Sequence, residues 1–457
     1  MPSPSWIRWK AVGGMIAALW LCRSGTAAEA DLPWKAGFAS ARITPKESMW
    51  LSGYGSRDHP AEGVRIDLWA KSIALEDRAG VRGVIVTLDL VGVDRELASA
   101  VRSQIHQQTG IAADHIVLSC SHTHTGPVVG KNLDTMYFFE ERERAKVDRY
   151  TDGLRSQVVQ LAVDALSRLR PAKLSWAVGH ESFGVNRRNN PEPLVPAHRA
   201  AGALRGPVDP SVPVLRIADV EGGLMGVVFG YACHATVLDD YLWSGDYPGF
   251  AQAELEQRHP STHALFLQGC GADINPLPRR TPELARQYGR RLADSVDRAL
   301  EGVLEPLSPE LAIRYAEMDL PFDTAPARAQ WEKLSEGKDR FAAAHARKML
   351  AILDKQGRLP ESYPYPLSVW RMGGKLEWVA LGGEVVVDYS LRLKRELGPS
   401  LWVSGYCHDV MAYIPSRRVW EEGGYEGGGA MIYYGLPTRW AGDVESRIVD
   451  KAISLSR

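Results

Sequence analysis

The sequence predicts an α/β fold with a mixed β-sheet core flanked by helices. Short runs rich in valine, isoleucine, leucine and aromatic residues recur along the chain and stop abruptly at polar or glycine residues, which is typical of buried strands. Segments with helical periodicity lie between these runs, so strands and helices alternate. The clearest strand runs are residues 84–88, 116–118, 227–232, 264–267 and 378–381.

Six segments predict helices, and two of them, residues 95–108 and 385–397, are followed by a glycine that favours a helix C-terminus. The others are residues 141–169, 248–258, 282–300 and 441–454. Residues 325–354, rich in Ala, Lys, Arg and Glu, predict one or two exposed helices outside the sheet. Proline and glycine predict loops at residues 189–213 and 359–366.

Charge and composition exclude some function classes. Of the 457 residues, 45% are hydrophobic, which is enough for a large buried core. Lysine and arginine total 54 against 55 aspartates and glutamates, without a long basic run, so nucleic acid is not an expected partner.

The N-terminus has the pattern of a secretory signal peptide. Arg8 and Lys10 precede an apolar run at residues 11–21, and small residues end at Ala28. The run is too short to span a bilayer core of ~30 Å, and no later run reaches ~20 apolar residues. We expect a signal peptide over residues 1–28, a catalytic domain over residues 29–457, no transmembrane segment, and a secreted or periplasmic protein.

Four cysteines follow the predicted signal peptide, namely Cys120, Cys233, Cys270 and Cys407. They show no CxxC spacing and read as buried small hydrophobic residues. An oxidising compartment permits a disulfide, and spacing alone does not decide whether any two cysteines lie close enough to form one.

Polar side chains follow several of the predicted strands. His122 and His124 come after the 116–118 run and His234 after the 227–232 run. Asn275 follows the 264–267 run and Glu384 the 378–381 run. Because ligands bind outside the carboxyl ends of strands in open α/β sheets, we expect the catalytic loops to meet at one crevice.

Histidines with a carboxylate are the ligand set of a catalytic zinc ion. His122 and His124, at i and i+2, project to the same side if their segment is extended. A single histidine in such a loop is more often a surface residue or a hydrogen-bonded core residue than a metal ligand. Two histidines directly after a buried strand favour a metal site. HExxH and GxSxG motifs are absent, so the ligands must come from dispersed loops.

These motifs resemble the neutral ceramidase family. The segment from His122 to Pro127 is similar to that family's Thr-His-Thr-His-Ser-Gly-Pro signature, and further matching motifs follow in the family's order over residues 37–429. They are Asn186-Arg187-Arg188, His234-Ala235-Thr236, Ser244-Gly245-Asp246 with Gly249, residues 271–276, Gly383-Glu384, Tyr413-Ile414 and Tyr425-Glu426-Gly427.

The resemblance implies one catalytic Zn²⁺ per chain, held by His122, His234, Glu384 and Tyr413 at the matching motif positions. An adjacent dication would favour the phenolate form of the tyrosine. The spacing from Tyr413 to Tyr425 matches that between the family's zinc tyrosine and a substrate-side tyrosine.

The implied reaction is attack of zinc-bound water on an amide carbonyl, with hydrogen-bond donors for the oxyanion that forms. His124, Arg187 and Tyr425 are the candidate donors. Asp273 is expected to orient a zinc histidine, and the alternative is that it caps the following turn.

The sequence departs from the family pattern in two places. Asn275 stands where the family has a serine, so a mechanism that needs this nucleophile is excluded, although an amide can still donate or accept a hydrogen bond. The immunoglobulin-like C-terminal domain of full-length ceramidases is not expected, because the chain ends about 30 residues after Tyr425.

The leading hypothesis is therefore a zinc-dependent amidohydrolase acting on a ceramide-like or other N-acyl lipid or small molecule. Such a substrate implies transient contact with a membrane surface. Two alternatives stay open: a zinc esterase or deacylase for another acylated metabolite or glycan, and a non-catalytic secreted binding module that keeps the fold.

Overall fold

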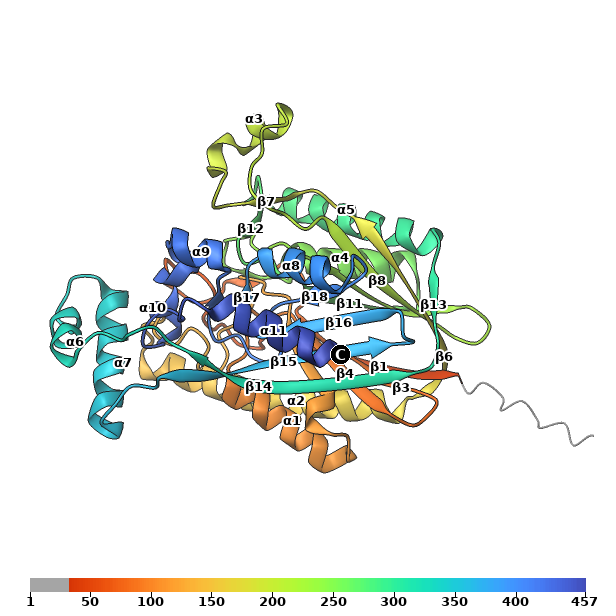
Figure 1. The fold of residues 1–457 in the computed structure, drawn as a ribbon, viewed down its shortest axis with the longest axis horizontal. Helices are drawn as coiled ribbons and strands as arrows, with labels where there is room; N and C mark the ends of the chain where they lie inside the picture. The colour runs from red at the N-terminus through yellow and green to blue at the C-terminus, as the bar shows by residue number, and fades with distance from the viewer. Residues whose placement is uncertain (1–32) are drawn as a thin grey trace, which may run out of the picture. The chain divides into compact units, whose positions relative to one another are not determined.

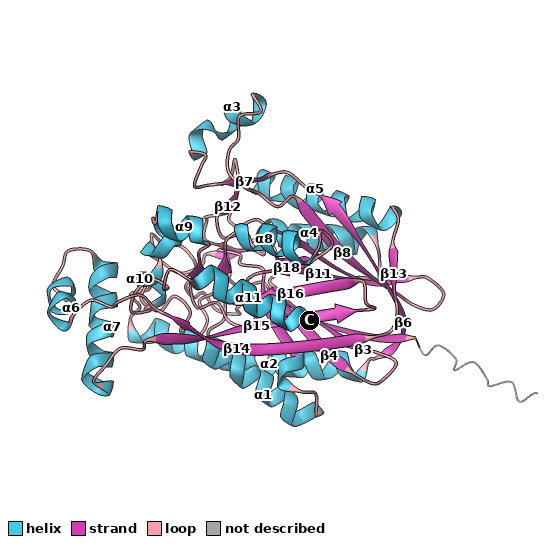
Figure 2. Cartoon of the chain, in the orientation of Figure 1, coloured by secondary structure: helices cyan, strands magenta, loops and turns pink. Residues whose placement is uncertain are grey.

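Two β-sheets stacked face to face form the core of the protein (Figures 1 and 2). The structure, a computed structural model, describes residues 33–457, so the predicted signal peptide lies outside the described residues. The larger sheet has nine strands in the order β11-β9-β8-β6-β1-β3-β4-β5, with β13 paired to β6. The smaller sheet has the order β14-β15-β16-β18.

The strands of the larger sheet are β1 (Trp34–Arg42), β3 (Trp69–Glu76), β4 (Arg82–Leu88), β5 (Ile116–Cys120), β6 (Arg170–His180), β8 (Ser211–Ala218), β9 (Leu224–Tyr231), β11 (His263–Gln268) and β13 (Glu305–Leu307). Those of the smaller sheet are β14 (Leu311–Pro321), β15 (Ser362–Met372), β16 (Leu376–Leu381) and β18 (Trp402–Ser404). Three two-stranded pairs connect loops: β2 (Gly63–Val64) with β10 (Leu242–Trp243), β7 (Gly184–Asn186) with β12 (Ile274–Pro276), and β17 (Glu384–Val385) with β19 (Tyr413–Ile414).

The helices are α1 (Arg95–Thr109), α2 (Glu141–Ser167), α3 (Val195–Ala200), α4 (Asp246–Arg258), α5 (Pro282–Glu301), α6 (Arg328–Ser335), α7 (Arg340–Gln356), α8 (Asp388–Leu397), α9 (Arg417–Glu422), α10 (Met431–Tyr434) and α11 (Val444–Ser456). A π-turn, η3 (Tyr425–Gly429), precedes α10, and short 3₁₀ turns occur at η1 (Ala113–His115) and η2 (Glu192–Leu194). Helices α1, α2, α4 and α5 cover the outer face of the larger sheet, whereas α8 and α11 pack on the smaller one.

The interface between the two sheets is aromatic. Phe38 of β1 and Leu265 of β11 belong to the same buried cluster as Trp370 and Trp378 of the smaller sheet. The two tryptophan rings lie with centroids 5.5 Å apart. Successive residues of a strand face opposite sides, so one strand supplies both this interface and the layer under the helices. On β11, for example, Phe266 packs with α4 and α5.

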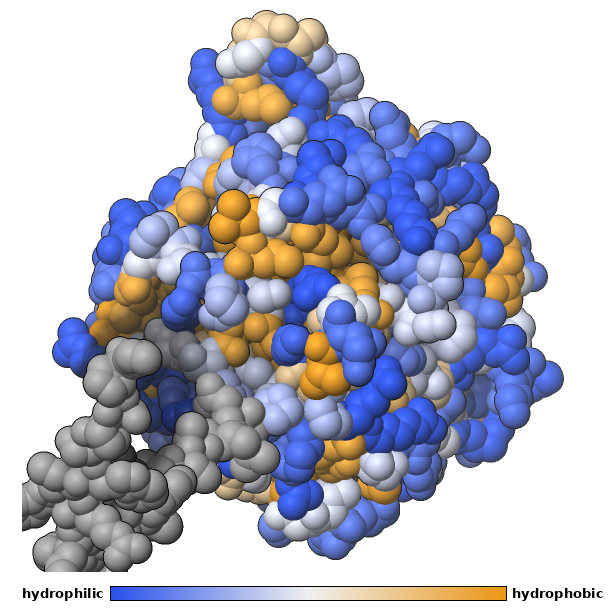
Figure 3. All heavy atoms as spheres, turned by 90° about the vertical axis from the view of Figure 1, so that its right-hand side faces the viewer, coloured by the Kyte–Doolittle hydropathy of each residue, from blue (hydrophilic) through white to orange (hydrophobic). Residues whose placement is uncertain are grey.

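The predicted fold class and most predicted elements are confirmed. Four of the five predicted strand runs fall within strands, and the fifth, residues 227–232, extends one residue beyond the end of β9. The charged segment at residues 325–354 forms α6 and α7, which project from the sheets at the left of Figure 1. The antiparallel strands β1, β3, β6, β8, β14 and β15 were not predicted. Figure 3 shows the end of the sheets that faces right in Figure 1, where apolar and hydrophilic side chains are mixed.

Two boundaries were wrong for physical reasons. The predicted loop at residues 359–366 overlaps β15, whose prolines Pro364 and Pro366 lie before the part of the strand that pairs with β16. Proline is tolerated at these two positions because no neighbouring strand there needs a backbone N–H donor from them. The helix predicted from Val385 starts at Asp388, because Glu384 and Val385 pair with β19.

The four cysteines are buried and free, as expected for small hydrophobic residues. Among residues 33–457, no helix is both long and apolar enough to cross a membrane.

Replacing Trp370 by alanine should lower the free energy of unfolding by about 3–5 kcal/mol, because it leaves a cavity between the sheets. The matched control is Trp69→Ala on β3, where the side chain is 38% exposed and the loss should be less than half as large. Urea unfolding followed by fluorescence measures both. An equal decrease in the free energy of unfolding in both variants would contradict a core between the two sheets.

Candidate metal centre

The loops that follow β5, β9 and β16 converge beside β19. His122 and His124 lie two and four residues beyond β5, and His234 lies three residues beyond β9. Glu384 and Tyr413 are direct neighbours in the register of the parallel pair β17–β19, so they approach the same point. The loops at these strand ends therefore bring together all four residues predicted to hold a metal.

The loop that carries His122 and His124 has an unusual backbone. His122 has a φ of 62°, in the left-handed region, so the segment is not extended as the i, i+2 argument assumed. Its amide donates to Leu90 O at 2.9 Å. The hydroxyls of Thr123 and Thr125 both donate to Ser244 O at 2.7 Å, which ties the loop to the Ser244-Gly245-Asp246 motif.

Tyr406 joins two of the converging loops. Its carbonyl accepts from Cys120 N at 3.1 Å and its amide donates to Gly383 O at 2.9 Å. The ring packs against His122 with centroids 4.4 Å apart. The loops of His122 and Glu384 are thus held together by backbone hydrogen bonds through one residue.

Five polar atoms lie within short distances of one another. Nε2 of His122 is 3.2 Å from Nε2 of His234 and 3.0 Å from Oε2 of Glu384. The His234 Nε2 atom is 3.3 Å from the same carboxylate oxygen and 3.4 Å from the Tyr413 hydroxyl. The His124 Nε2 atom is 3.2 Å from that of His122.

Hydrogen bonds on the far side of each ring fix the tautomers of His122 and His234. Nδ1 of His122 donates to Val91 O at 2.6 Å, and Nδ1 of His234 donates to Gly271 O at 2.8 Å. A carbonyl oxygen can only accept, so in the neutral rings both Nε2 atoms carry lone pairs. Two lone pairs and a carboxylate oxygen therefore face one another, and a cation between them would remove the repulsion.

The separations suit a tetrahedral ion. Donors about 2.1 Å from a central zinc ion at tetrahedral angles lie about 3.4 Å apart. The four distances that link His122, His234, Glu384 and Tyr413 run from 3.0 to 3.4 Å. The donor set, with its outer ring nitrogens bound to carbonyls, fits zinc.

Burial and neighbouring charges favour the protonation states that a metal needs. Burial, reinforced by Arg187, lowers the pKa of His234 to about 4. Burial alone would raise the pKa of Glu384, and positive charge on the neighbouring histidines is what holds this pKa well below its usual value, a role that a bound cation would take over. At neutral pH His234 is neutral.

His124, which was predicted to donate a hydrogen bond to the substrate, lies directly beside the histidines that were predicted to bind the metal. The ligand nitrogens of His122, His124 and His234 lie within 4.8 Å of one another. Burial lowers the pKa of His124 well below its usual value. Its Nδ1 has no hydrogen-bond partner among the described residues, and the ring of Tyr54 packs against it at 4.7 Å.

Arg187 and Asn275, predicted as catalytic residues, meet at the edge of the cluster. Arg187 donates to the Tyr413 hydroxyl and to Asn275 Oδ1, each at 3.3 Å. Because Oδ1 of Asn275 accepts a hydrogen bond from Arg187, the amide Nδ2 of Asn275 can donate to another group. The pairing of β7 with β12 places these two side chains together.

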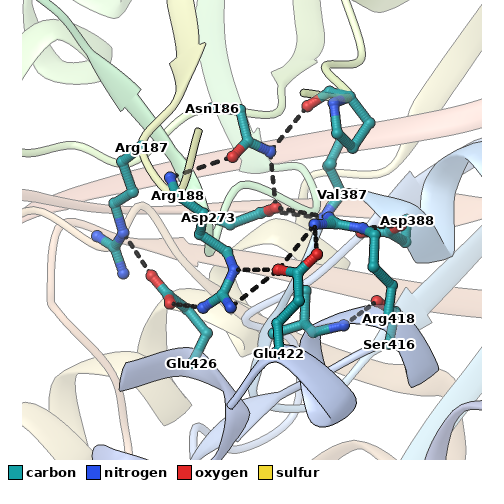
Figure 4. Close-up of polar contacts among 12 residues, drawn as sticks. Asn186, Arg187, Arg188, Asp273, Val387, Asp388, Ser416, Arg418, Glu422 and Glu426 are labelled. Carbon is teal, nitrogen blue, oxygen red and sulfur yellow. Dashed lines mark hydrogen bonds and ion pairs between the residues drawn. The ribbon is translucent and has the colours of Figure 1, made fainter. Parts of the chain in front are cut away.

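The segment that carries Tyr425 is fastened by ion pairs, as Figure 4 shows. Glu426 accepts from Arg187 Nε at 2.7 Å and from Arg188 Nη1 at 2.5 Å. The neighbouring Tyr425 ring lies 5.2 Å from that of Tyr413 and is 43% exposed. Tyr425 therefore stands at the solvent side of the cluster.

Asp273 does not orient a zinc histidine directly, contrary to the prediction. Its carboxylate accepts from Val387 N at 2.9 Å and from Asn186 Nδ2 at 3.0 Å, and it lies 3.7 Å from Arg418 (Figure 4). Its role is to hold the start of α8 against the Asn186-Arg187-Arg188 segment.

Two contacts of the cluster were missed by the sequence analysis. The Tyr434 hydroxyl donates to Glu384 Oε1, which orients the carboxylate. Arg57 donates to the carbonyl of His124 at 2.7 Å. Neither residue lies in a recognisable motif, and both reach the cluster through the tertiary fold, so no local signal marks them.

The fold and the cluster define an α/β protein with a buried histidine–carboxylate–tyrosine site suited to a metal. The family model of neutral/alkaline non-lysosomal ceramidase, N-terminal, matches residues 34–279. The chain belongs to this ceramidase family.

Relatives and solved structures agree with this membership. The chain is 24% identical to neutral ceramidase of Pseudomonas aeruginosa over 96% of its own length and 75% of that protein. It is 26% identical to neutral ceramidase A of Dictyostelium discoideum over 54% of its length and 37% of that protein. The crystal structure of the Pseudomonas aeruginosa enzyme has the same fold, with a TM-score of 0.70, 21% identity, and coverage of 93% of this chain and 75% of that chain.

Replacing Glu426 by glutamine should lower the free energy of unfolding by about 2–3 kcal/mol at pH 7, because Arg187 loses its buried counter-charge. Glu422→Gln is the matched control: it also removes a carboxylate from Arg188, but its side chain is 40% exposed and the loss should stay below about 1 kcal/mol.

The effect of Glu426→Gln should depend on pH. Burial raises the pKa of Glu426, but Arg187 outweighs this and the pKa is lower than usual. A carboxyl group whose pKa is lowered in the folded state stabilises the protein. This stabilisation is fully present above the unfolded pKa of about 4.3 and is lost as the pH falls through the lower folded-state pKa. Urea unfolding should therefore show the variant and the parent converging below about pH 4. A pH-independent difference would contradict the ion pair.

Proposed function

We propose that the protein is a zinc-dependent amidohydrolase that cleaves a ceramide-like N-acyl amide into a fatty acid and an amine. The observation that carries this proposal is the meeting of two lone-pair nitrogens and a carboxylate oxygen at the strand ends. His122, His234, Glu384 and Tyr413 would hold one zinc ion per chain. Membership of the ceramidase family supports the amide bond and the lipid substrate.

Zinc at this site would polarise the substrate carbonyl and lower the pKa of a bound water molecule to about 7. The residues of the chain supply the rest of the chemistry. Arg187 and Tyr425 offer hydrogen-bond donors on the solvent side of Tyr413, where a carbonyl oxygen that gains negative charge needs them. Neutral His124 keeps one ring N–H and serves as a third donor.

Asn275 supports attack by water rather than by a side chain. An amide is not a nucleophile, so no acyl-enzyme intermediate forms at this position. Its Oδ1 is held by Arg187, so its amide N–H groups serve to orient the substrate. We also propose that residues 29–457 form the catalytic domain of a secreted or periplasmic protein that contacts membrane surfaces transiently.

Asn275 also favours a second candidate, a zinc esterase or deacylase acting on another acylated metabolite or glycan. The same donors would stabilise the oxyanion of an ester, whose leaving group needs less protonation than an amine. The two candidates differ in substrate rather than in the metal centre.

The purified protein should contain about one zinc ion per chain, measured by inductively coupled plasma mass spectrometry after dialysis. His234→Ala should lose the metal, because one of four ligands is missing. The control is His259→Ala, since His259, directly after the C-terminus of α4, pairs with Asp297 of α5 and contacts none of the four proposed ligands, so the zinc content should not change. A zinc content that His234→Ala does not alter would contradict the proposal.

Hydrolysis of a panel of N-acyl sphingoid bases, N-acyl amino acids and O-acyl esters should show highest kcat/KM on the N-acyl sphingoid bases. Asn275→Ala should lower kcat on the best substrate by about 10²-fold, because one oriented donor is lost. Higher activity on the esters would instead select the second candidate.

A further inference from the structure

A cavity of about 420 Å³ lies next to the metal centre. Tyr54 lines the cavity, and its ring packs on that of His124 with centroids 4.7 Å apart. Arg57 lines the cavity as well and donates to His124 O at 2.7 Å. The loop that carries Tyr54 and Arg57 therefore contacts both the cavity and the metal centre. The volume of the cavity is within the range of small-molecule sites.

Aromatic rings form one part of the cavity lining. Phe138 is 43% exposed, and Trp50 and Tyr54 are half-buried, so their rings are within reach of a ligand. The guanidinium of Arg340 lies over the Phe138 ring, 5.0 Å from its centroid, and donates to Gly55 O at 2.7 Å. The exposed Phe138 ring is therefore held in place by a cation–π contact.

Charged side chains of both signs form another part of the lining. They are Arg57, Asp58, Glu140, Glu143 and Arg340. Guanidinium groups only donate hydrogen bonds and carboxylates only accept them. Because neither sign dominates, the lining favours a neutral ligand with many polar atoms over an anion or a cation.

The lining contains one buried donor and one buried acceptor that have no hydrogen-bond partner among residues 33–457. The donor is Nε of Arg57, whose side chain is 5% exposed and whose Nη atoms donate to the carbonyls of Ser52, His124 and Asp240. The acceptor is Oε2 of Glu143, whose Oε1 pairs with Lys146 at 2.8 Å. An unpaired buried polar atom costs free energy, so a ligand that both donates and accepts would be favoured.

We propose that this cavity binds one pyranose ring of a neutral carbohydrate. The C–H face of a pyranose packs on aromatic rings such as Phe138, and its hydroxyl groups can both accept from Arg57 and donate to Glu143. Water would partner the two polar atoms, but it has no apolar face for the rings. The proposal goes beyond the proposed function and does not depend on it, because this binding needs neither a metal nor hydrolysis.

Saturation-transfer difference NMR on zinc-stripped protein tests the binding directly. The probes are methyl β-glucoside, methyl β-galactoside and methyl N-acetyl-β-glucosaminide, and at least one should bind with a Kd of about 1 mM. Glu143→Gln should raise that Kd by about tenfold, because a charged acceptor is lost. Phe138→Ala should raise it by about fivefold, because the aromatic face is lost.

Two matched variants control for indirect effects. Asp152→Asn also removes the carboxylate of an i, i+3 ion pair on α2, and Trp69→Ala removes an aromatic ring that is 38% exposed on β3. Neither residue lines this cavity, so both variants should keep the parent Kd.

Three results would overturn the proposal. They are no binding of any glycoside, an unchanged Kd in both Glu143→Gln and Phe138→Ala, and an equal loss of affinity in the two control variants. Binding of choline or inorganic phosphate in place of the glycosides would also overturn it, because the cavity would then be an ion site.

The sugar has two sources, a head group on the substrate or a separate glycan, and hydrolysis by the zinc-loaded enzyme distinguishes them. A head group predicts a higher kcat/KM for an N-acyl sphingoid base that carries the preferred sugar, and Phe138→Ala should remove this preference. A separate glycan predicts equal kcat/KM with and without the sugar. The NMR measurement alone decides whether the site exists, so failure of the proposed function is a separate result.

Discussion

The Nε2 atoms of His122 and His234 and the Oε2 atom of Glu384 face one another in a buried space. The two outer ring nitrogens are committed to backbone carbonyls, so the three inner atoms are all acceptors. Buried acceptors without a donor cost free energy unless a cation or proton lies between them. The lowered pKa of His234 disfavours a proton on its ring, and a metal ion would satisfy the arrangement.

The rest of the fold holds these atoms together against their mutual repulsion. The two stacked sheets end at the same edge, and backbone hydrogen bonds connect the loops that leave them. Tyr406 joins the loops of His122 and Glu384, while β17–β19 sets Glu384 beside Tyr413. The left-handed backbone of His122 is a local strain that these contacts maintain, as is common at functional sites.

Sequence reasoning could locate the site but not its finer geometry. Strand runs ending in polar residues predicted that the loops of His122, His234 and Glu384 would meet, because the carboxyl ends of strands define a sheet edge. Tyr413 came only from family resemblance, since a tyrosine in a loop carries no periodic signal. The bond from Tyr434 to Glu384 depends on how α10 packs. The strands of the smaller sheet that carry proline or half-exposed residues, such as β14 and β15, lack the continuous apolar run that marks a buried strand.

We propose that His122, His234, Glu384 and Tyr413 enclose one zinc ion. Anomalous diffraction from crystals of the purified protein, recorded on both sides of the zinc absorption edge, tests it most directly. The account predicts one strong peak within about 2.0–2.3 Å of all four donor atoms. A peak elsewhere, or a fully ordered site without any peak in zinc-supplemented crystals, would contradict it.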